Sequence, residues 1–273
     1  MKRTNVVKLI VDKNIHEKLK ELAVVTAKCW NEVTRTQKEV YEKYKHVLKV
    51  NAQQKSGKYK LIIVIRNDRY EVDEENRVIY LKDFKLALRF KGKFKWHGKQ
   101  GRLEMIYDEA RRSWYAHILV EVENVAEARG GLRASVDLGI VNLATVYVED
   151  GTWYIFKGGS VLSRYEYYSK RVSEVQKVLA RHEQKRSRKL KLLYDKRRRF
   201  LKHTLNSMVR KIMEELREKG VGEVVIGYPK EINRNRGNKL TVNFWNYSYV
   251  IKRFEEVGEE LGCLLYTSDA ADE

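Results

Sequence analysis

Apolar and polar positions first follow the period of a strand and then that of a helix. Residues 6–11 form a short, mainly apolar strand. Asn14 follows, with Glu17 three residues later, a spacing typical of a capping box. Apolar residues then recur at steps of three and four, which predicts a long helix with one buried face, Cys29 included. That face comprises Ile15, Leu19, Leu22, Val25, Cys29, Trp30 and Val33.

Strand-like alternation returns after residue 60 and predicts a small twisted barrel. The segments concerned are 61–66, 77–81, 85–90, 101–108 and 113–123. Paired glycines at 130–131 then interrupt the pattern and mark a domain boundary near Arg133. We therefore expect a first domain at residues 1–133, β-barrel-like, with a helical insertion at about 13–50.

Residues 134–262 read as a second, α/β domain. Three short strands with tight glycine-containing turns come first, and a helical hairpin over 164–219 follows. A strand at 223–226 precedes a last helix, whose apolar stripe we expect to pack on the sheet. The three strands are 134–138, 143–149 and 152–157, and the stripe comprises Phe244, Tyr247, Ile251, Phe254 and Val257.

Composition narrows the class of partner. The chain has 273 residues, 56 Lys and Arg against 37 Asp and Glu, and a net charge of +19. Such an excess predicts a polyanionic partner, by default nucleic acid. The two cysteines, Cys29 and Cys263, exclude a disulfide framework, and no apolar run reaches the length of a membrane span. We expect a cytoplasmic protein with no membrane partner.

Two basic segments are candidate nucleic-acid contacts. In the first, residues 89–102, the cations Lys91, Lys93 and Lys95 interleave with Trp96 and two phenylalanines, a pattern suited to phosphates and stacked bases. The alternative is a solvated hairpin whose rings point inward, with His97 at its surface.

The second basic segment lies in the predicted helical hairpin. Residues 181–202 hold eleven Lys or Arg and two acids, which favours salt-dependent phosphate binding over a merely solvated helix face. The candidate contacts are Arg181, Lys185, Arg186, Arg188, Lys189, Arg197, Arg198, Arg199, Lys202, His203 and Arg210.

Asp137 interrupts the apolar strand 134–138. A carboxylate there is costly unless it lies on an exposed sheet face or binds a cation. The segments Asp137-Leu138-Gly139-Ile140 and Asn142-Leu143-Ala144-Thr145 resemble the first catalytic motif of the RuvC-like, RNase H-like nuclease domain of TnpB (OrfB) proteins, transposon-encoded relatives of type V CRISPR effectors. The order of elements over residues 1–262 fits the same family.

The resemblance implies an RNA-guided DNA endonuclease with guide RNA and target DNA as partners. It makes the first domain the wedge-like domain that grips the guide RNA, and residues 134–262 an incomplete RuvC domain. It also makes Asp137 the first of three carboxylates around Mg²⁺ or Mn²⁺. Paired metal ions about 3.5–4 Å apart activate the water and stabilise the leaving oxygen in such centres. Zinc is expected only in a four-cysteine ribbon beyond residue 262.

One position departs from the family pattern. Gly227 aligns with the second catalytic acid at the end of the strand 223–226, and neither Glu223 nor Glu231 has the expected placement. The variant IGYPK resembles a branch of the family in which a Glu farther along the chain takes over that role.

The last eleven residues call for a separate interpretation. The string CLLYTSDAADE at 263–273 resembles the translation of a sequencing adapter, so we expect a C-terminally truncated, inactive chain. The alternative is a native tail in which Leu264 and Leu265 form a short strand.

Three functions stay open at this point. The first is the RNA-guided endonuclease. The second is a nuclease-dead descendant that binds RNA and DNA as a regulator, for which Gly227 is the direct hint. The third is an unrelated nucleic-acid-binding module, for which the Asp137 motif would be a coincidence.

Overall fold

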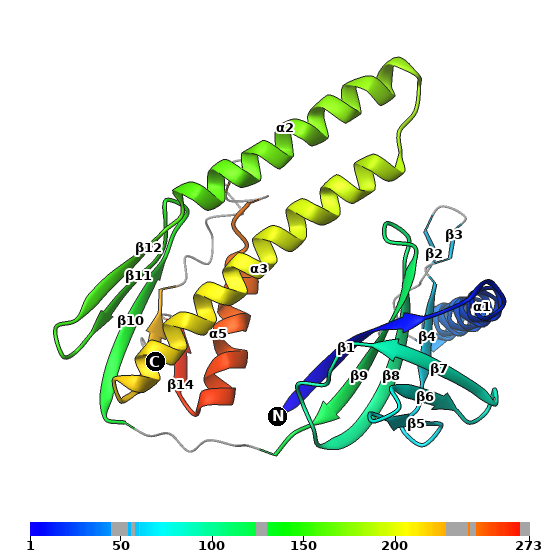
Figure 1. Ribbon diagram of the computed structural model, residues 1–273, viewed down its shortest axis with the longest axis horizontal. Coiled ribbons are helices and arrows are strands. Elements are labelled where there is room, and N and C mark those ends of the chain that lie inside the picture. Colours follow the sequence, from blue (N-terminus) through cyan, green and yellow to red (C-terminus); the bar gives the residue numbers. More distant parts are fainter. Residues whose placement is uncertain are drawn as a thin grey trace. The chain divides into compact units, whose positions relative to one another are not determined.

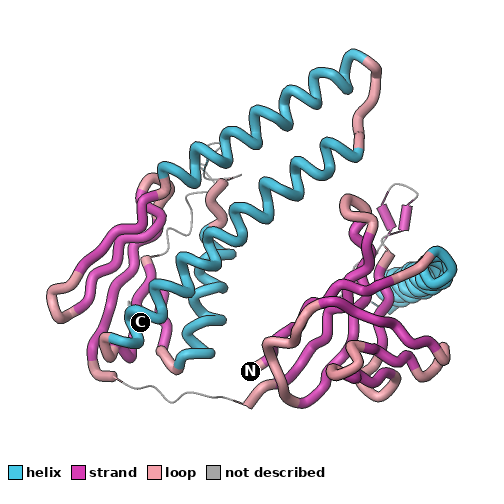
Figure 2. Tube along the Cα trace, in the orientation of Figure 1, coloured by secondary structure: helices cyan, strands magenta, loops and turns pink. Residues whose placement is uncertain are grey.

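The computed structural model describes residues 1–44, 54–55, 58–59, 61–123, 130–227, 240 and 244–267, with the backbone alone for 37–44, 54–55 and 58–59. The chain divides into two compact units, Met1–Glu123 and Asn124–Glu273. Figure 2 shows that each unit combines strands with at least one long helix. No helix in these ranges is both long enough and apolar enough to cross a bilayer.

The first unit is built on a seven-stranded antiparallel sheet in the order β4-β8-β9-β1-β7-β6-β5. The two edge strands, β4 and β5, follow each other in the chain, and the Tyr70 hydroxyl of β5 donates to the Gly101 carbonyl of β8 at 2.7 Å. The sheet therefore curls until its edges approach, as the barrel prediction requires. Its strands are β1 (Lys2–Ile10), β4 (Ile62–Ile65), β5 (Tyr70–Asp73), β6 (Val78–Leu81), β7 (Leu86–Lys91), β8 (Lys99–Asp108) and β9 (Ser113–Glu121).

Helix α1 (Lys13–Tyr44) confirms the predicted helix but differs in its cap and its buried face. The cap is Asp12, whose Oδ1 accepts the Ile15 N–H at 2.7 Å, so the assignment to Asn14 was wrong. Leu19 and Ala23 belong to the core of the sheet, and Ile15 and Leu22 pack against it. The rest of the predicted face, Val25, Cys29, Trp30 and Val33, is exposed. The prediction of a buried Cys29 was therefore also wrong. A two-stranded ribbon, β2 (Gln54–Lys55) with β3 (Lys58–Tyr59), follows α1.

The second unit has a five-stranded sheet in the order β12-β11-β10-β13-β14. Strands β10 (Leu132–Leu138), β11 (Asn142–Val148) and β12 (Trp153–Lys157) are antiparallel, and β13 (Val221–Ile226) pairs with β10 in parallel. The crossover between these parallel strands carries the predicted hairpin, α2 (Gly159–Arg181) and α3 (Arg188–Glu218), which Figure 1 shows reaching well beyond the sheet.

Helices α3 and α5 (Tyr247–Leu261) cover one face of this sheet (Figure 1). The core joins the inward residues of β10, β11 and β13 to the apolar stripes of both helices, and every position predicted for the last stripe is buried. The opposite face of the sheet carries exposed side chains, Trp153 at 66% among them.

Strand β14 (Leu264–Thr267) extends the sheet through residues that the sequence interpretation had set aside. It pairs in parallel with β13, with Glu223 opposite Leu264 and Ile226 opposite Thr267. The Cys263 Sγ lies 3.5 Å from the Val221 carbonyl, and burial raises the pKa of this thiol. That residues 263–273 derive from a sequencing adapter stays a prediction. Four of them, Leu264–Thr267, nevertheless form strand β14 of the sheet.

Candidate catalytic site and nucleic-acid interface

Asp137 lies near the carboxyl end of β10, on the face of the sheet opposite to α3 and α5. Its neighbours Val136 and Leu138 are buried, while its own side chain is exposed and sits opposite Thr145 of β11. The following turn needs glycine, since a Cβ on Gly139 would come within 2.8 Å of the Asn142 carbonyl. The chain therefore presents the Asp137 carboxylate to solvent without the cost of burying a charge.

Gly227 lies directly beside Asp137. The parallel register places Ile226 opposite Val136, and the Gly227 N–H donates to the Val136 carbonyl at 3.0 Å. A Cβ at Gly227 would lie 3.7 Å from Asp137 Oδ1, an ordinary contact distance. A side chain at position 227 would therefore lie next to the Asp137 carboxylate, and glycine supplies none.

Tyr247 is a neighbour of Asp137 that the sequence pattern assigned to core packing alone. It opens α5, where Asn246 caps the helix by accepting the Tyr249 N–H at 3.1 Å. Burial and, secondarily, the negative charge of Asp137 raise the pKa of the Tyr247 phenol. Its side chain is buried and lies within electrostatic range of the Asp137 carboxylate. Helical periodicity indicates burial only, and no signal in the sequence pointed to this proximity.

The described residues do not by themselves complete a metal centre. Within 1–36, 61–123, 130–227, 240 and 244–267, no three His, Cys, Asp or Glu side chains gather as a metal site would require. Glu223 lies at the far end of β13, where it pairs with Arg133 at 3.3 Å. Glu231 lies outside the described residues. Asp137 can supply one ligand, which is too few to hold an ion alone.

The rings of the first basic segment pack inward. Phe90 is buried, Phe94 stacks on it at 5.6 Å between centroids, and both belong to the core of the sheet with Trp96. The outer face of Trp96 is covered by cations, with Lys95 Nζ at 4.2 Å and the Arg3 guanidinium at 5.4 Å. Phe90 is unable to stack a base because it is buried. Phe94 and Trp96 are only partly buried, so base stacking by these two rings stays a prediction.

A buried asparagine holds this segment in place. The Asn5 side chain accepts the Lys95 and Trp96 N–H groups at 3.0 Å and donates to the Trp96 carbonyl at 2.7 Å. His97 is at the surface, 3.3 Å from Glu74, as predicted. The lysines at 91 and 93 remain exposed and able to meet phosphates.

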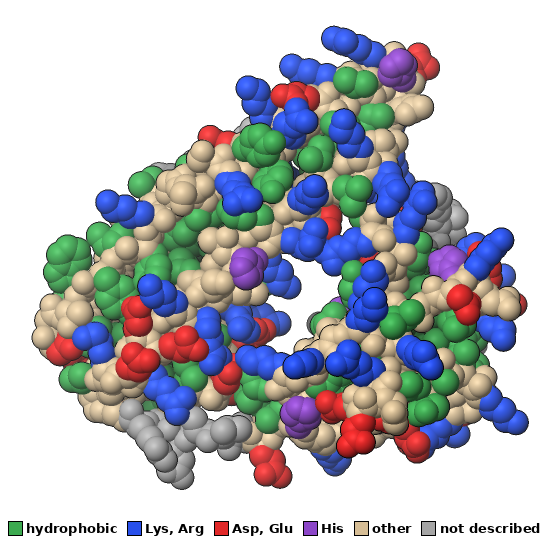
Figure 3. All heavy atoms as spheres, viewed as in Figure 1, with side chains coloured by type: hydrophobic (Ala, Val, Ile, Leu, Met, Phe, Trp, Pro, Cys, Tyr) green, Lys and Arg blue, Asp and Glu red, His purple; other side chains and the backbone are tan. Residues whose placement is uncertain are grey.

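The hairpin separates into a tip and a stem. At the tip, Arg181, Lys185, Arg186, Arg188 and Lys189 are exposed, and in the described part of the chain none of them forms an ion pair. Figure 3 shows Lys and Arg side chains around this tip and along both helices. Ser187 caps α3 by accepting the Leu190 N–H at 3.1 Å, which fixes where the turn ends.

Stem arginines are bound within the hairpin. Asp195 is only 5% exposed and pairs with Arg198 at 3.1 Å and Arg199 at 3.0 Å. Arg197 donates to Ser169 Oγ at 2.9 Å and lies over the rings of Tyr165 and Tyr194, so it fastens α3 to α2. Asp195, which directly precedes the basic residues 196–199, is the sequence signal that could have identified this internal network.

The remaining candidates on α3 differ in exposure. Lys202 and His203 are exposed, and Lys202 Nζ lies 5.5 Å from the centre of the Tyr249 ring. Arg210 bonds through its guanidinium to Glu214 and Glu260, so the structure gives it a link between α3 and α5. Its positive charge is matched inside the unit, unlike the charges at the tip.

A solved structure described as a Cas12f1-sgRNA-target DNA complex shares this fold. The TM-score is 0.51 at 14% identity, over 84% of this chain and 58% of that one. A CRISPR-Cas12f ternary complex gives a TM-score of 0.42 at 12% identity, over 94% and 72% of the two chains. The molecule is thus a mixed α/β protein of the architecture seen in Cas12f1, and it spans about three fifths of that protein's length.

Sequence comparison gives the family. A family model described as OrfB_IS605, probable transposase, matches residues 117–233, which include Asp137. The TnpB-like protein ORF457 of Acidianus two-tailed virus is 32% identical over a match of 351 residues, which covers 98% of this chain and 77% of that protein. The chain belongs to the TnpB (OrfB) family.

Proposed function

We propose that the chain acts in RNA-guided, metal-dependent cleavage of DNA, with guide RNA and target DNA as partners. The observation that carries this proposal is the exposed Asp137 at the carboxyl end of β10, beside the end of the parallel strand β13. Family membership and the Cas12f1 fold support it. Asp137 would be one ligand of Mg²⁺ or Mn²⁺, and further donors must come from outside the described residues.

The basic surfaces support nucleic acid as the partner. The tip of the hairpin gathers five exposed cations without internal acid partners in the described residues, and the first unit adds Lys91 and Lys93. Phosphate contacts of this kind bind without regard to base sequence and position a strand rather than read it. Sequence choice would then belong to the pairing of a guide with its target.

Gly227 favours a second candidate function. A chain with one carboxylate at this sheet end can bind RNA and DNA without cutting, and would then act as a nuclease-dead regulator. The vacant Cβ position 3.7 Å from Asp137 Oδ1 is the specific observation for it. In that case the tip cations matter for function and Asp137 does not.

One experiment separates the two candidates. The chain is purified with the RNA that accompanies it, that RNA is sequenced to define a guide, and matching DNA is supplied with Mg²⁺ or Mn²⁺. The 273-residue chain is expected to be inactive, so the assay uses a protein that also supplies the further donors. In that protein we expect cleavage that Asp137→Asn lowers by more than about 100-fold, since changes to mere neighbours of metal ligands already cost about 10–100-fold.

Glu166→Gln is the matched control, because Glu166 is an exposed acid on α2. It should cleave like the unmodified chain. RNA and DNA binding without cleavage, unchanged by Asp137→Asn, would refute the endonuclease and support the regulator.

A further inference from the structure

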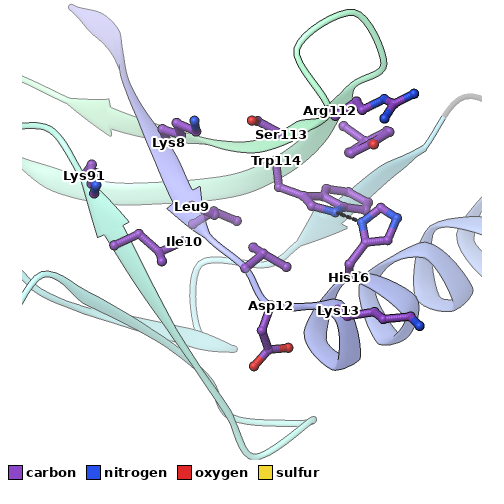
Figure 4. A pocket seen from close by; sticks show the side chains of 12 residues that line it. Lys8, Leu9, Ile10, Asp12, Lys13, His16, Lys91, Arg112, Ser113 and Trp114 are labelled. Carbon is purple, nitrogen blue, oxygen red and sulfur yellow. Dashed lines mark hydrogen bonds between the residues drawn. The ribbon is translucent and has the colours of Figure 1, made fainter.

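The first unit contains a concave site that the catalytic proposal does not use. It lies where β1 runs into α1, beside the end of β7 and the turn between β8 and β9, and its volume is about 430 Å³ (Figure 4). That volume falls within the range of about 300–1,000 Å³ typical of small-molecule sites. Every lining residue comes from the first unit, so the site depends on that unit alone.

Three aromatic rings form one side of this site. The His16 and Tyr107 rings lie 5.1 Å apart, and the Tyr107 and Trp114 rings lie 5.2 Å apart. The Trp114 indole N–H donates to His16 Nδ1 at 3.0 Å, the dashed line in Figure 4. Because an indole nitrogen can only donate, Nδ1 is the acceptor and a neutral imidazole carries its proton on Nε2. The site therefore offers ring surface together with a hydrogen-bond donor.

Four cations surround these rings. Lys8, Lys13, Lys91 and Arg112 line the site, and none of them pairs with an acid in the described part of the chain. Asp12 is the one acid among the lining residues, and its Oδ1 is held by the Ile15 N–H as the cap of α1. The lining thus combines an excess of positive charge with aromatic surface.

We infer that this site binds a single unstacked nucleotide, with its base against the His16 and Tyr107 rings and its phosphates near Lys8, Lys91 and Arg112. Stacking on aromatic rings with cations along the backbone is how proteins hold unpaired bases. Tyr107 and His16 are partly accessible and lie among these cations, so the first unit can stack a base at this site. The inference rests on the proposed function only in taking nucleic acid as the partner.

The test uses the full chain and four labelled 20-base-pair duplexes, in RNA and in DNA, each with and without one unpaired adenosine. Fluorescence anisotropy at 0.15 M salt measures each affinity. We expect the unpaired adenosine to tighten binding at least about 5-fold in RNA, in DNA or in both. A gain of about 5-fold in affinity corresponds to the weakest stacking of a base on an aromatic side chain. If only the RNA duplex with the unpaired adenosine binds more tightly than its paired counterpart, the site holds a nucleotide of an RNA strand. If only the DNA duplex does so, the site holds a nucleotide of a DNA strand. If both do so, the site accepts either.

His16→Gln keeps an acceptor for Trp114 but removes the ring, and should abolish the preference. Tyr107→Leu is the second variant, and thermal unfolding checks that both fold. His97→Gln, an exposed histidine elsewhere in this unit, is the matched control and should keep the preference. Equal binding of paired and unpaired duplexes by the unmodified chain, or equal losses in His16→Gln and His97→Gln, would overturn the inference. DNA cleavage that persists in those circumstances would leave the proposed function intact.

Discussion

Neutralising the hairpin tip should weaken the salt dependence of nucleic-acid binding by a calculable amount. Lys185, Arg186 and Lys189 are exposed and without acid partners in the described residues, so each is able to neutralise one phosphate. Each phosphate neutralised on duplex DNA contributes about 0.9 to the slope of log Kobs against log salt. The triple change to Gln should therefore reduce that slope by about 2.7. Between 0.05 and 0.2 M salt, the variant should lose about 40-fold less affinity than the unmodified chain.

A matched variant controls for net charge. Arg171, Lys211 and Lys219 also lie in the second unit, but each pairs with an acid, Glu174 at 2.9 Å, Glu215 at 3.6 Å and Asp150 at 3.5 Å. Changing all three to Gln removes the same charge from cations that are already partly compensated, so the slope should change little. Anisotropy titrations of a 20-base-pair DNA at four salt concentrations measure both variants. Equal slopes for the two variants would show that only overall charge matters and would refute the assignment of the tip.

Four further predictions concern the second unit. Gly227→Ala should stabilise the chain by about 0.4–1 kcal/mol in urea unfolding, because its Cβ would meet only ordinary contacts among the described residues. Gly130→Ala should instead destabilise it, since φ is +148° and the Cβ would lie 1.9 Å from a backbone carbonyl. Asp195→Ala should cost about 1.5–3 kcal/mol in the same assay, the value of charged hydrogen bonds, and no loss would contradict the stem network. Asp137→Asn should lower the raised pKa of the Tyr247 phenol, followed by absorbance at 295 nm against Tyr247→Phe, and an unchanged titration would contradict their proximity.

The same tyrosine has a consequence for stability at alkaline pH. Its folded pKa is raised above the unfolded value, so the stability that its neutral form contributes is fully present below pH 10 and is lost as pH rises through the folded pKa. Asp137→Asn should make that loss smaller, because the carboxylate charge no longer opposes the phenolate.

Much of the architecture was predictable because it follows from local periodicity. The strands around Asp137, the hairpin and the stripe of α5 all lie where alternation or a helical step indicated them. The cap of α1 was assigned wrongly because Asp12 and Asn14 both suit that role, and only the Ile15 hydrogen bond distinguishes them. Cys29 was wrongly predicted to be buried. Apolar residues lie on more than one side of α1, and the side that contains Ala23 is the one that packs on the sheet.

The charge, the two-unit order of elements and the candidate Asp137 could be read from the sequence, because they depend on composition and near neighbours along the chain. The same composition predicts a nucleic-acid partner. Which cations are available for phosphate depends on contacts that form only in the folded chain. Arg197 and Arg199 are held by a tyrosine pair and by Asp195, while Lys185 and Lys189 are not. The pairing of Gly227 with Asp137 and the ring cluster at His16 likewise join residues about 90 or more positions apart, and no local pattern encodes such contacts.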